Sequence, residues 1–156
     1  MESHRRNSLR LREYDYSQPG EYFVTICTAD RRCVLGDVVE GKVELSKVGE
    51  IVASCWQEIP RHFLNTKVGT FRIMPNHMHG IIQINENPVG VEYIQPLQRN
   101  ARRYQHVIPN SLESIVRSFK AAVTRESHRK KMSELPLWQH SFYDHIIRNE
   151  VDHFFI

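Results

Sequence analysis

The sequence contains no long apolar run and no secretory signal. A transmembrane helix needs about 18 or more consecutive apolar residues, and no such run occurs in the chain. The N-terminal stretch MESHRRNSLRLREYDYS is basic and polar, without the apolar segment of a signal peptide. We therefore expect a cytoplasmic protein that does not use a membrane as its partner.

Cysteine is also scarce, which argues against a disulfide framework. Cys27, Cys33 and Cys55 are odd in number and lack zinc-ligand spacing, so we expect reduced thiols. The length of 156 residues allows one domain with a real core but not two. Because 40% of the residues are hydrophobic and 25% are charged, as in ordinary globular proteins, we predict a single domain over residues 1–156.

The net charge is only +3, but the basic residues are clustered. Clusters of Arg and Lys suit a polyanion such as DNA or RNA. One cluster alone is explained more simply as a solvated loop or helix end, whereas three clusters beside a candidate metal site favour a nucleic-acid partner. The clusters are Arg5, Arg6, Arg10 and Arg12; Arg99, Arg102 and Arg103; and Arg125, His128, Arg129, Lys130 and Lys131.

Hydrophobic periodicity and turn residues predict a mixture of strands and helices. Ser46 and Ser111 are placed to cap two amphipathic helices, and Pro75-Asn76 separates two strand-like runs. The predicted elements are, in order, a strand (21–28), a hairpin (33–46), a helix (46–63), two antiparallel strands (68–74 and 77–84), a helix (111–129), a strand (137–147) and a final helix from 148 that is incomplete at 156.

Without the hairpin, this order is β-α-β-β-α-β, the split βαβ or ferredoxin-like pattern. We therefore predict an α+β fold, in which an antiparallel sheet carries two helices on one face and a C-terminal helix follows. The strand at 77–84 is expected to be central, and the other sheet face is free for a metal and a nucleic acid. Residues 85–110, with prolines at 88, 96 and 109, predict a long loop insertion.

The stretch MPNHMHGIIQI places two histidines, His77 and His79, on one predicted strand. Residues two apart on a strand project from the same face, about 7 Å apart, so both imidazoles can reach one metal ion. Such a pair also occurs by chance as a structural or solvent-facing pair. Apolar neighbours, a position at the strand start and the open coordination sites that two ligands leave favour the metal.

The longer string MPNHMHGII resembles the HUH motif (histidine, bulky hydrophobe, histidine) of the single-tyrosine transposases, and most of all the REP-associated tyrosine transposases. Three further segments are similar to this family and occur in its order, so the resemblance covers nearly the whole chain. These segments are YDYSQPGEYFVTICT, SLESIVRSFKAAVTR and LWQHSFYDHIIRNE.

The resemblance implies an enzyme that nicks and rejoins single-stranded DNA at hairpins through a 5′-phosphotyrosine intermediate. His77 and His79 would hold Mg²⁺ or Mn²⁺, and Met78 would be the hydrophobe. The family is usually dimeric, so a homodimer is expected. A divalent cation on a non-bridging phosphate oxygen lowers the barrier to nucleophilic attack.

The nucleophilic tyrosine of the family has no counterpart in the chain, and the resemblance implies that it lies a few residues past Ile156. The chain is therefore expected to be C-terminally truncated, with no catalytic nucleophile and no identified third ligand. An inactive remnant that binds DNA hairpins is the alternative, and an unrelated metal hydrolase is a weaker one. Tyr143 is the tempting substitute nucleophile, but strand packing or base stacking explains it better, and His145 shares its face.

We predict DNA contacts from basic and aromatic residues spread along the chain. Tyr14 and Tyr16 are interleaved with arginines and could stack on bases while the arginines hold phosphates. The predicted DNA-binding residues are Arg10, Arg12, Tyr14, Arg117, Lys120 and Arg148.

Overall fold

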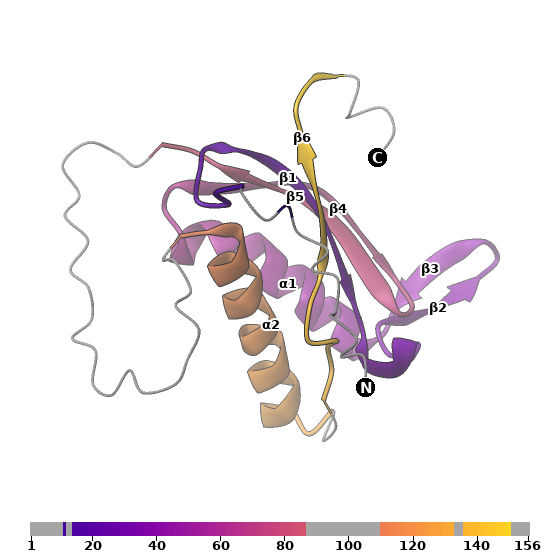
Figure 1. Ribbon diagram of the computed structural model, residues 1–156. Coiled ribbons are helices and arrows are strands. Elements are labelled where there is room, and N and C mark those ends of the chain that lie inside the picture. Colours follow the sequence, from indigo (N-terminus) through magenta and orange to yellow (C-terminus); the bar gives the residue numbers. More distant parts are fainter. Residues whose placement is uncertain (1–10, 12–13, 87–109, 133–135, 151–156) are drawn as a thin grey trace, which may run out of the picture.

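Four antiparallel strands form one sheet in the computed structural model, which describes residues 11, 14–86, 110–132 and 136–150 (Figure 1). The strand order is β4-β5-β1-β6, so β5 and β1 are central and the predicted central position of the histidine strand is confirmed. The strands are β1 (Gly20–Cys27), β4 (Thr66–Met74), β5 (His77–Ile84) and β6 (Tyr143–Ile147).

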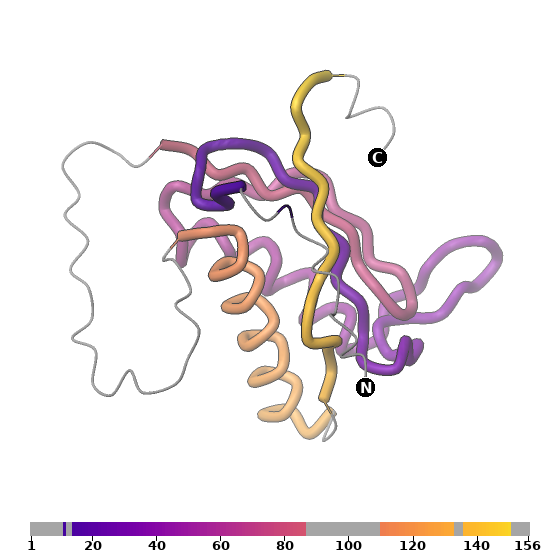
Figure 2. The backbone as a smooth tube through the Cα atoms, in the orientation of Figure 1, coloured from indigo at the N-terminus to yellow at the C-terminus, as the bar shows by residue number. Residues whose placement is uncertain are grey.

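Two helices cover one face of this sheet (Figures 1 and 2). They are α1 (Lys47–His62), which lies between β1 and β4 in the chain, and α2 (Leu112–Arg129), which lies between β5 and β6. The order β1-α1-β4-β5-α2-β6 therefore confirms the predicted alternation and the α+β class. None of the described helices is long and apolar enough to cross a membrane.

Strict alternation along β5 separates the two faces of the sheet. Met78, Gly80, Ile82 and Ile84 are buried toward the helices, and the residues between them are half-buried on the opposite face. We call that opposite face the open face. It carries His77 and His79, together with the β1 and β6 residues that the strand register places beside them.

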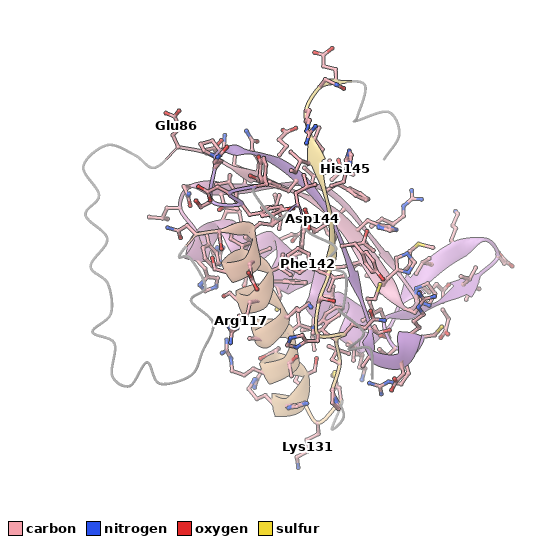
Figure 3. All side chains as sticks on the ribbon, viewed as in Figure 1. Glu86, Arg117, Lys131, Phe142, Asp144 and His145 are labelled. Carbon is pink, nitrogen blue, oxygen red and sulfur yellow. The ribbon has the colours of Figure 1, made fainter. Side chains whose placement is uncertain are left out.

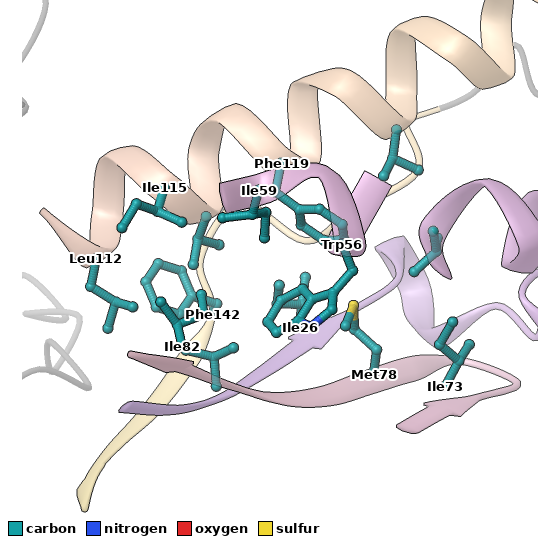
Figure 4. Packing of buried hydrophobic residues seen from close by; sticks show 14 of the residues in the cluster. Ile26, Trp56, Ile59, Ile73, Met78, Ile82, Leu112, Ile115, Phe119 and Phe142 are labelled. Carbon is teal, nitrogen blue, oxygen red and sulfur yellow. The ribbon is translucent and has the colours of Figure 1, made fainter. Parts of the chain in front are cut away.

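The core between sheet and helices is built from large apolar side chains (Figure 4). Trp56 on α1 is fully buried and packs edge-to-face on Phe119 of α2, with ring centroids 5.4 Å apart. Met78 and Ile82 approach from β5, so this cluster fixes the height of both helices above the central strand. Burial of these side chains is the main stabilising contribution.

Serine caps begin both helices, as predicted. The Oγ of Ser46 accepts a hydrogen bond from the Gly49 N–H at 3.1 Å and donates one to the Val34 carbonyl at 2.7 Å. Ser111 accepts a bond from the Ser114 N–H at 3.3 Å. Such caps satisfy backbone N–H groups that have no partner within the helix.

Replacement of Ser46 by alanine is expected to lower the free energy of unfolding by about 1–2 kcal/mol, because a cap bond and a bond to a loop carbonyl are both lost. Urea unfolding followed by circular dichroism measures the change. Ser54→Ala, at an exposed position of the same helix, is the control and should change stability by less than about 0.5 kcal/mol. Equal effects of the two substitutions would show that the cap is not stabilising.

A separate hairpin of β2 (Gly36–Val39) and β3 (Lys42–Leu45) is inserted between β1 and α1. Its two-residue turn has positive φ at Glu40 (48°) and Gly41 (76°), the combination that a tight hairpin turn requires. A short 3₁₀ turn, Ala29–Arg31, precedes it and had no clear sequence signal. The hairpin extends away from the four-stranded sheet (Figure 1).

The last strand is shorter than the sequence predicted. Of residues 137–147, only Tyr143–Ile147 form β6, while Trp138 makes a single bridge to Thr28. Residues 139–141 instead turn their carbonyls toward Lys120 of α2, which explains why the run does not continue as a strand. Most of the predicted insertion, together with residues 151–156 of the final helix, lies outside the described residues.

Candidate metal centre on the open face of the sheet

His77 and His79 lie at the beginning of β5, directly after the Pro75-Asn76 turn. This turn is held by neighbouring segments: the N–H and the hydroxyl of Thr28 both bond to the Asn76 carbonyl at 3.0 Å. The Leu35 N–H bonds to the Pro75 carbonyl at 2.9 Å. The start of β5 is therefore anchored on a rigid part of the fold, as a site with defined geometry requires.

The two imidazoles converge. Their Nε2 atoms are 3.1 Å apart and their ring centroids are 4.6 Å apart, with the ring planes nearly perpendicular. Two ligand atoms bound about 2.1 Å from an octahedral ion lie about 3.0 Å apart at adjacent corners. The observed separation fits the two nitrogens to one cation.

The second nitrogen of each ring has its own partner. The Oδ1 of Asn76 accepts a hydrogen bond from Nδ1–H of His77 at 2.7 Å, and the Thr25 hydroxyl is 2.9 Å from Nδ1 of His79. The Asn76 bond places the proton of His77 on Nδ1, so its Nε2 has a lone pair that faces Nε2 of His79 at hydrogen-bond distance. Thr25 can accept from a protonated Nδ1, which would free the Nε2 of His79 as well. Partners of this kind orient metal-bound histidines and select their tautomer.

Burial lowers the pKa of both imidazoles below the ordinary value. For His79, the neighbouring His77 and the positive charge of Arg72 lower the pKa further. Both rings are therefore neutral near pH 7, the protonation state in which imidazole binds a metal. No group of three His, Cys, Asp or Glu residues that could hold a metal occurs in the part of the chain that the structure describes.

Aromatic and polar side chains surround the pair on the open face. The Phe23 ring stacks on the His79 ring, with centroids 5.4 Å apart and an interplanar angle of 17°. Strand register places Arg72, His79, Thr25 and Tyr143 in one row across β4, β5, β1 and β6. Tyr143 lies two strands from His79, so their backbones are about 10 Å apart.

Tyr143 and His145 share one face of β6, as predicted. This is the open face, because the two residues pair with Thr25 and Phe23. Tyr143 is 44% exposed, which leaves its ring accessible. His145, labelled on β6 in Figure 3, is also exposed.

Two of the predicted DNA-binding residues have structural contacts of their own. The Lys120 ammonium donates to the carbonyls of Gln139, His140 and Ser141 at 2.9, 3.5 and 3.0 Å. Tyr14 packs edge-on against Tyr16 and lies 3.3 Å, oxygen to oxygen, from the Tyr22 hydroxyl. A DNA contact by either residue would have to replace or supplement these interactions.

The remaining predicted DNA-binding residues are separated from the imidazole pair or lie outside the described part. Arg117 is exposed on α2, on the helix side of the sheet (Figure 3). Arg148 directly follows β6 and is exposed. Arg10 and Arg12 lie outside the described residues.

Sequence reasoning missed the residues that complete the site from other strands. The sequence predicts only a turn at Asn76, and it contains no local signal that Thr25, Phe23 and Arg72 belong to a site. Their alternation with buried residues shows which face they occupy, but only the pairing register of β1 and β4 with β5 shows that they lie beside His79.

A relative at high identity identifies the family. An uncharacterised protein of Haemophilus influenzae is 42% identical over 149 residues, which cover 94% of this chain and 81% of that protein. The chain belongs to the same family as this protein. No family model matches the sequence.

Two solved structures are similar to this chain in fold. A REP-associated tyrosine transposase, determined bound to a REP hairpin, is similar with a TM-score of 0.60 at 19% identity, covering 94% of this chain. This chain spans 66% of that protein. A candidate transposase from Deinococcus radiodurans R1 is similar with a TM-score of 0.51 at 16% identity, covering 94% of this chain and 91% of the other.

Proposed function

We propose that this protein is a cation-dependent transposase or endonuclease that nicks and rejoins single-stranded DNA at hairpins through a 5′-phosphotyrosine intermediate. The observation that carries the proposal is the convergence of the His77 and His79 Nε2 atoms on the open face of this fold. Support comes from the solved relative of the same fold, which was determined with a REP hairpin. The ferredoxin-like arrangement and a homodimer belong to the same proposal.

His77 and His79 would hold Mg²⁺ or Mn²⁺. When bound, the cation neutralises charge on the scissile phosphate and polarises it toward attack. Two nitrogen ligands bind these oxygen-preferring ions weakly, so water, the phosphate and a further protein ligand are needed to complete the site.

The chain's own residues would prepare this site before DNA arrives. Asn76 and Thr25 fix the two rings, and Phe23 stacks on His79. The attack of a tyrosine oxygen on phosphorus would form the phosphotyrosine bond, and the displaced 3′-oxygen would take up a proton. Tyr143 is not assigned this role, because it lies two strands from His79 and its exposure suits base stacking.

Hairpin-bearing single-stranded DNA is expected to bind more tightly than an unstructured strand of the same composition. Binding should weaken steeply with salt, because Lys and Arg contacts to phosphate release counterions. Fluorescence anisotropy across about 50–300 mM salt measures both effects. Equal affinity for the two strands, or salt-independent binding, would contradict the DNA-binding part of the proposal.

Strand cleavage is tested on the full-length protein with a 5′-labelled hairpin strand and Mn²⁺ or Mg²⁺. We expect a nicked product and a protein–DNA adduct that survives denaturing electrophoresis, and neither product with EDTA. Hairpin binding without a nick or an adduct would favour the alternative, a hairpin-binding remnant. Hydrolysis of a small phosphate ester without affinity for DNA would instead favour a metal hydrolase.

A further inference from the structure

Arg72 lies beside the imidazole pair on the open face. It pairs directly with His79 across β4 and β5, so the two side chains project from the same face on neighbouring strands. β4 is an edge strand of the four-stranded sheet, and Arg72 is exposed. An extended chain that reaches the imidazoles from this edge of the sheet would meet the guanidinium first.

No carboxylate among the described residues forms an ion pair with Arg72. Ion pairs in the described parts of the chain join Glu126 to Arg129 and Lys130. The row that contains Arg72, His79, Thr25 and Tyr143 has no carboxylate. Glu21 is the acidic residue on the open face of β1. It pairs with Gln83, which is four residues along β5 from His79, and Lys67 pairs with the same residue from β4.

This placement is unfavourable for a cation alone. A positive charge on the strand position directly beside His79 opposes the binding of a second positive charge, a metal ion, by the imidazoles. An anion that lies between the guanidinium and the cation reverses the sign of the effect. Guanidinium groups bind phosphate oxygens through paired, charge-assisted hydrogen bonds, so a phosphodiester is the anion that fits.

We propose that Arg72 binds the phosphodiester that the cation held by His77 and His79 also contacts, so that cation and DNA bind cooperatively. This inference rests on the proposed function and adds a phosphate-binding residue to it. Arg72 would favour occupancy of the site by cation and DNA together and disfavour occupancy by the cation alone. By linkage, each ligand then raises the affinity of the other by the same factor.

Arg72→Gln is the test, because it removes the charge from an exposed position and keeps a polar side chain of similar length. Titration of the protein with Mn²⁺ alone should give equal or tighter binding, whereas hairpin DNA in the presence of Mn²⁺ should bind about tenfold more weakly. The factor by which DNA raises Mn²⁺ affinity should also shrink. If Arg72 had only a structural role, the substitution would weaken the binding of Mn²⁺ and of DNA together and would lower the unfolding temperature.

Lys67→Gln is the matched control. Lys67 lies on the same strand and face as Arg72, but it pairs with Gln83, which is four residues along β5 from His79. It removes the same charge and should affect DNA binding only through general attraction, without changing the coupling to Mn²⁺. If the unsubstituted protein binds hairpin DNA but Arg72→Gln and Lys67→Gln change the affinities for DNA and Mn²⁺ equally, the proposed role of Arg72 is wrong. If the unsubstituted protein does not bind hairpin DNA, the proposed function fails first.

Discussion

Replacing His77 with alanine is expected to abolish binding of Mn²⁺ to the open face and, in the full-length protein, to abolish strand cleavage. Two imidazole nitrogens 3.1 Å apart form the candidate centre, and removal of one leaves a single ligand. A single imidazole holds Mn²⁺ too weakly to compete with water, so a loss of at least about 100-fold in affinity is expected. Isothermal titration or Mn²⁺ electron paramagnetic resonance measures it.

The matched control is His145→Ala, which removes a histidine from the same face that has no place in the pair. Mn²⁺ affinity should be unchanged in this variant. Hairpin DNA in EDTA should still bind to His77→Ala, because the phosphate contacts by Lys and Arg do not depend on the cation. Unchanged Mn²⁺ affinity in His77→Ala would refute the metal centre.

The pH dependence of Mn²⁺ binding adds a check with a defined sign. Protons compete with the cation for the imidazole nitrogens, so binding is lost as pH falls through the pKa values of the pair. Because burial lowers both pKa values, the loss should occur below the ordinary imidazole value of about 6.5. Half-loss of binding above that value would show that other groups hold the ion.

The order of the secondary structure was predictable because local signals agreed with one another. Ser46 and Ser111 each precede an apolar stripe of helical period. The short hairpin turn requires positive φ at both of its central residues, and Glu40 and Gly41 adopt it. The last strand was predicted over residues 137–147 but covers only Tyr143–Ile147, because a tertiary contact overrides the local signal. Its apolar residues have strand character, but the tertiary contact to Lys120 binds the carbonyls of residues 139–141.

The candidate site was only partly predictable. His77 and His79 are close in sequence, so their spacing on one strand reveals the pair directly. Thr25 is 54 residues from His79, and no local pattern indicates that its hydroxyl meets that ring. The same holds for Phe23 and Arg72, since a shift of the register by one residue would move all three to the buried face.

Among the described glycines of the four-stranded sheet, Gly80 is expected to cause the largest loss of stability when it is replaced by alanine. Gly80 is buried on β5 beneath Trp56, and a Cβ there would lie 2.8 Å from Cη2 and 3.0 Å from Cε2 of the indole, and closer still to Cζ2. Trp56 is fully buried and packed against Phe119, so it cannot move aside freely. Overpacking of this kind should lower the free energy of unfolding by about 3 kcal/mol.

The control is Gly20→Ala on β1, where the nearest atom to the added Cβ is the Tyr22 hydroxyl at 3.6 Å, an ordinary contact. It should change stability by less than about 0.5 kcal/mol, as measured by urea unfolding. Equal stability of Gly80→Ala and Gly20→Ala would show that the indole can repack.

A double-mutant cycle with Trp56→Phe isolates the contact. The smaller ring removes the atoms that clash, and it costs no hydrogen bond among the described residues, because the Trp56 Nε1 has no partner there. The double variant should therefore be less destabilised than the sum of the two single variants, by about 2 kcal/mol. Gly80 follows His79 directly but faces the helices, whereas His79 lies on the open face. Additive effects would mean that the sheet and the helix adjust independently.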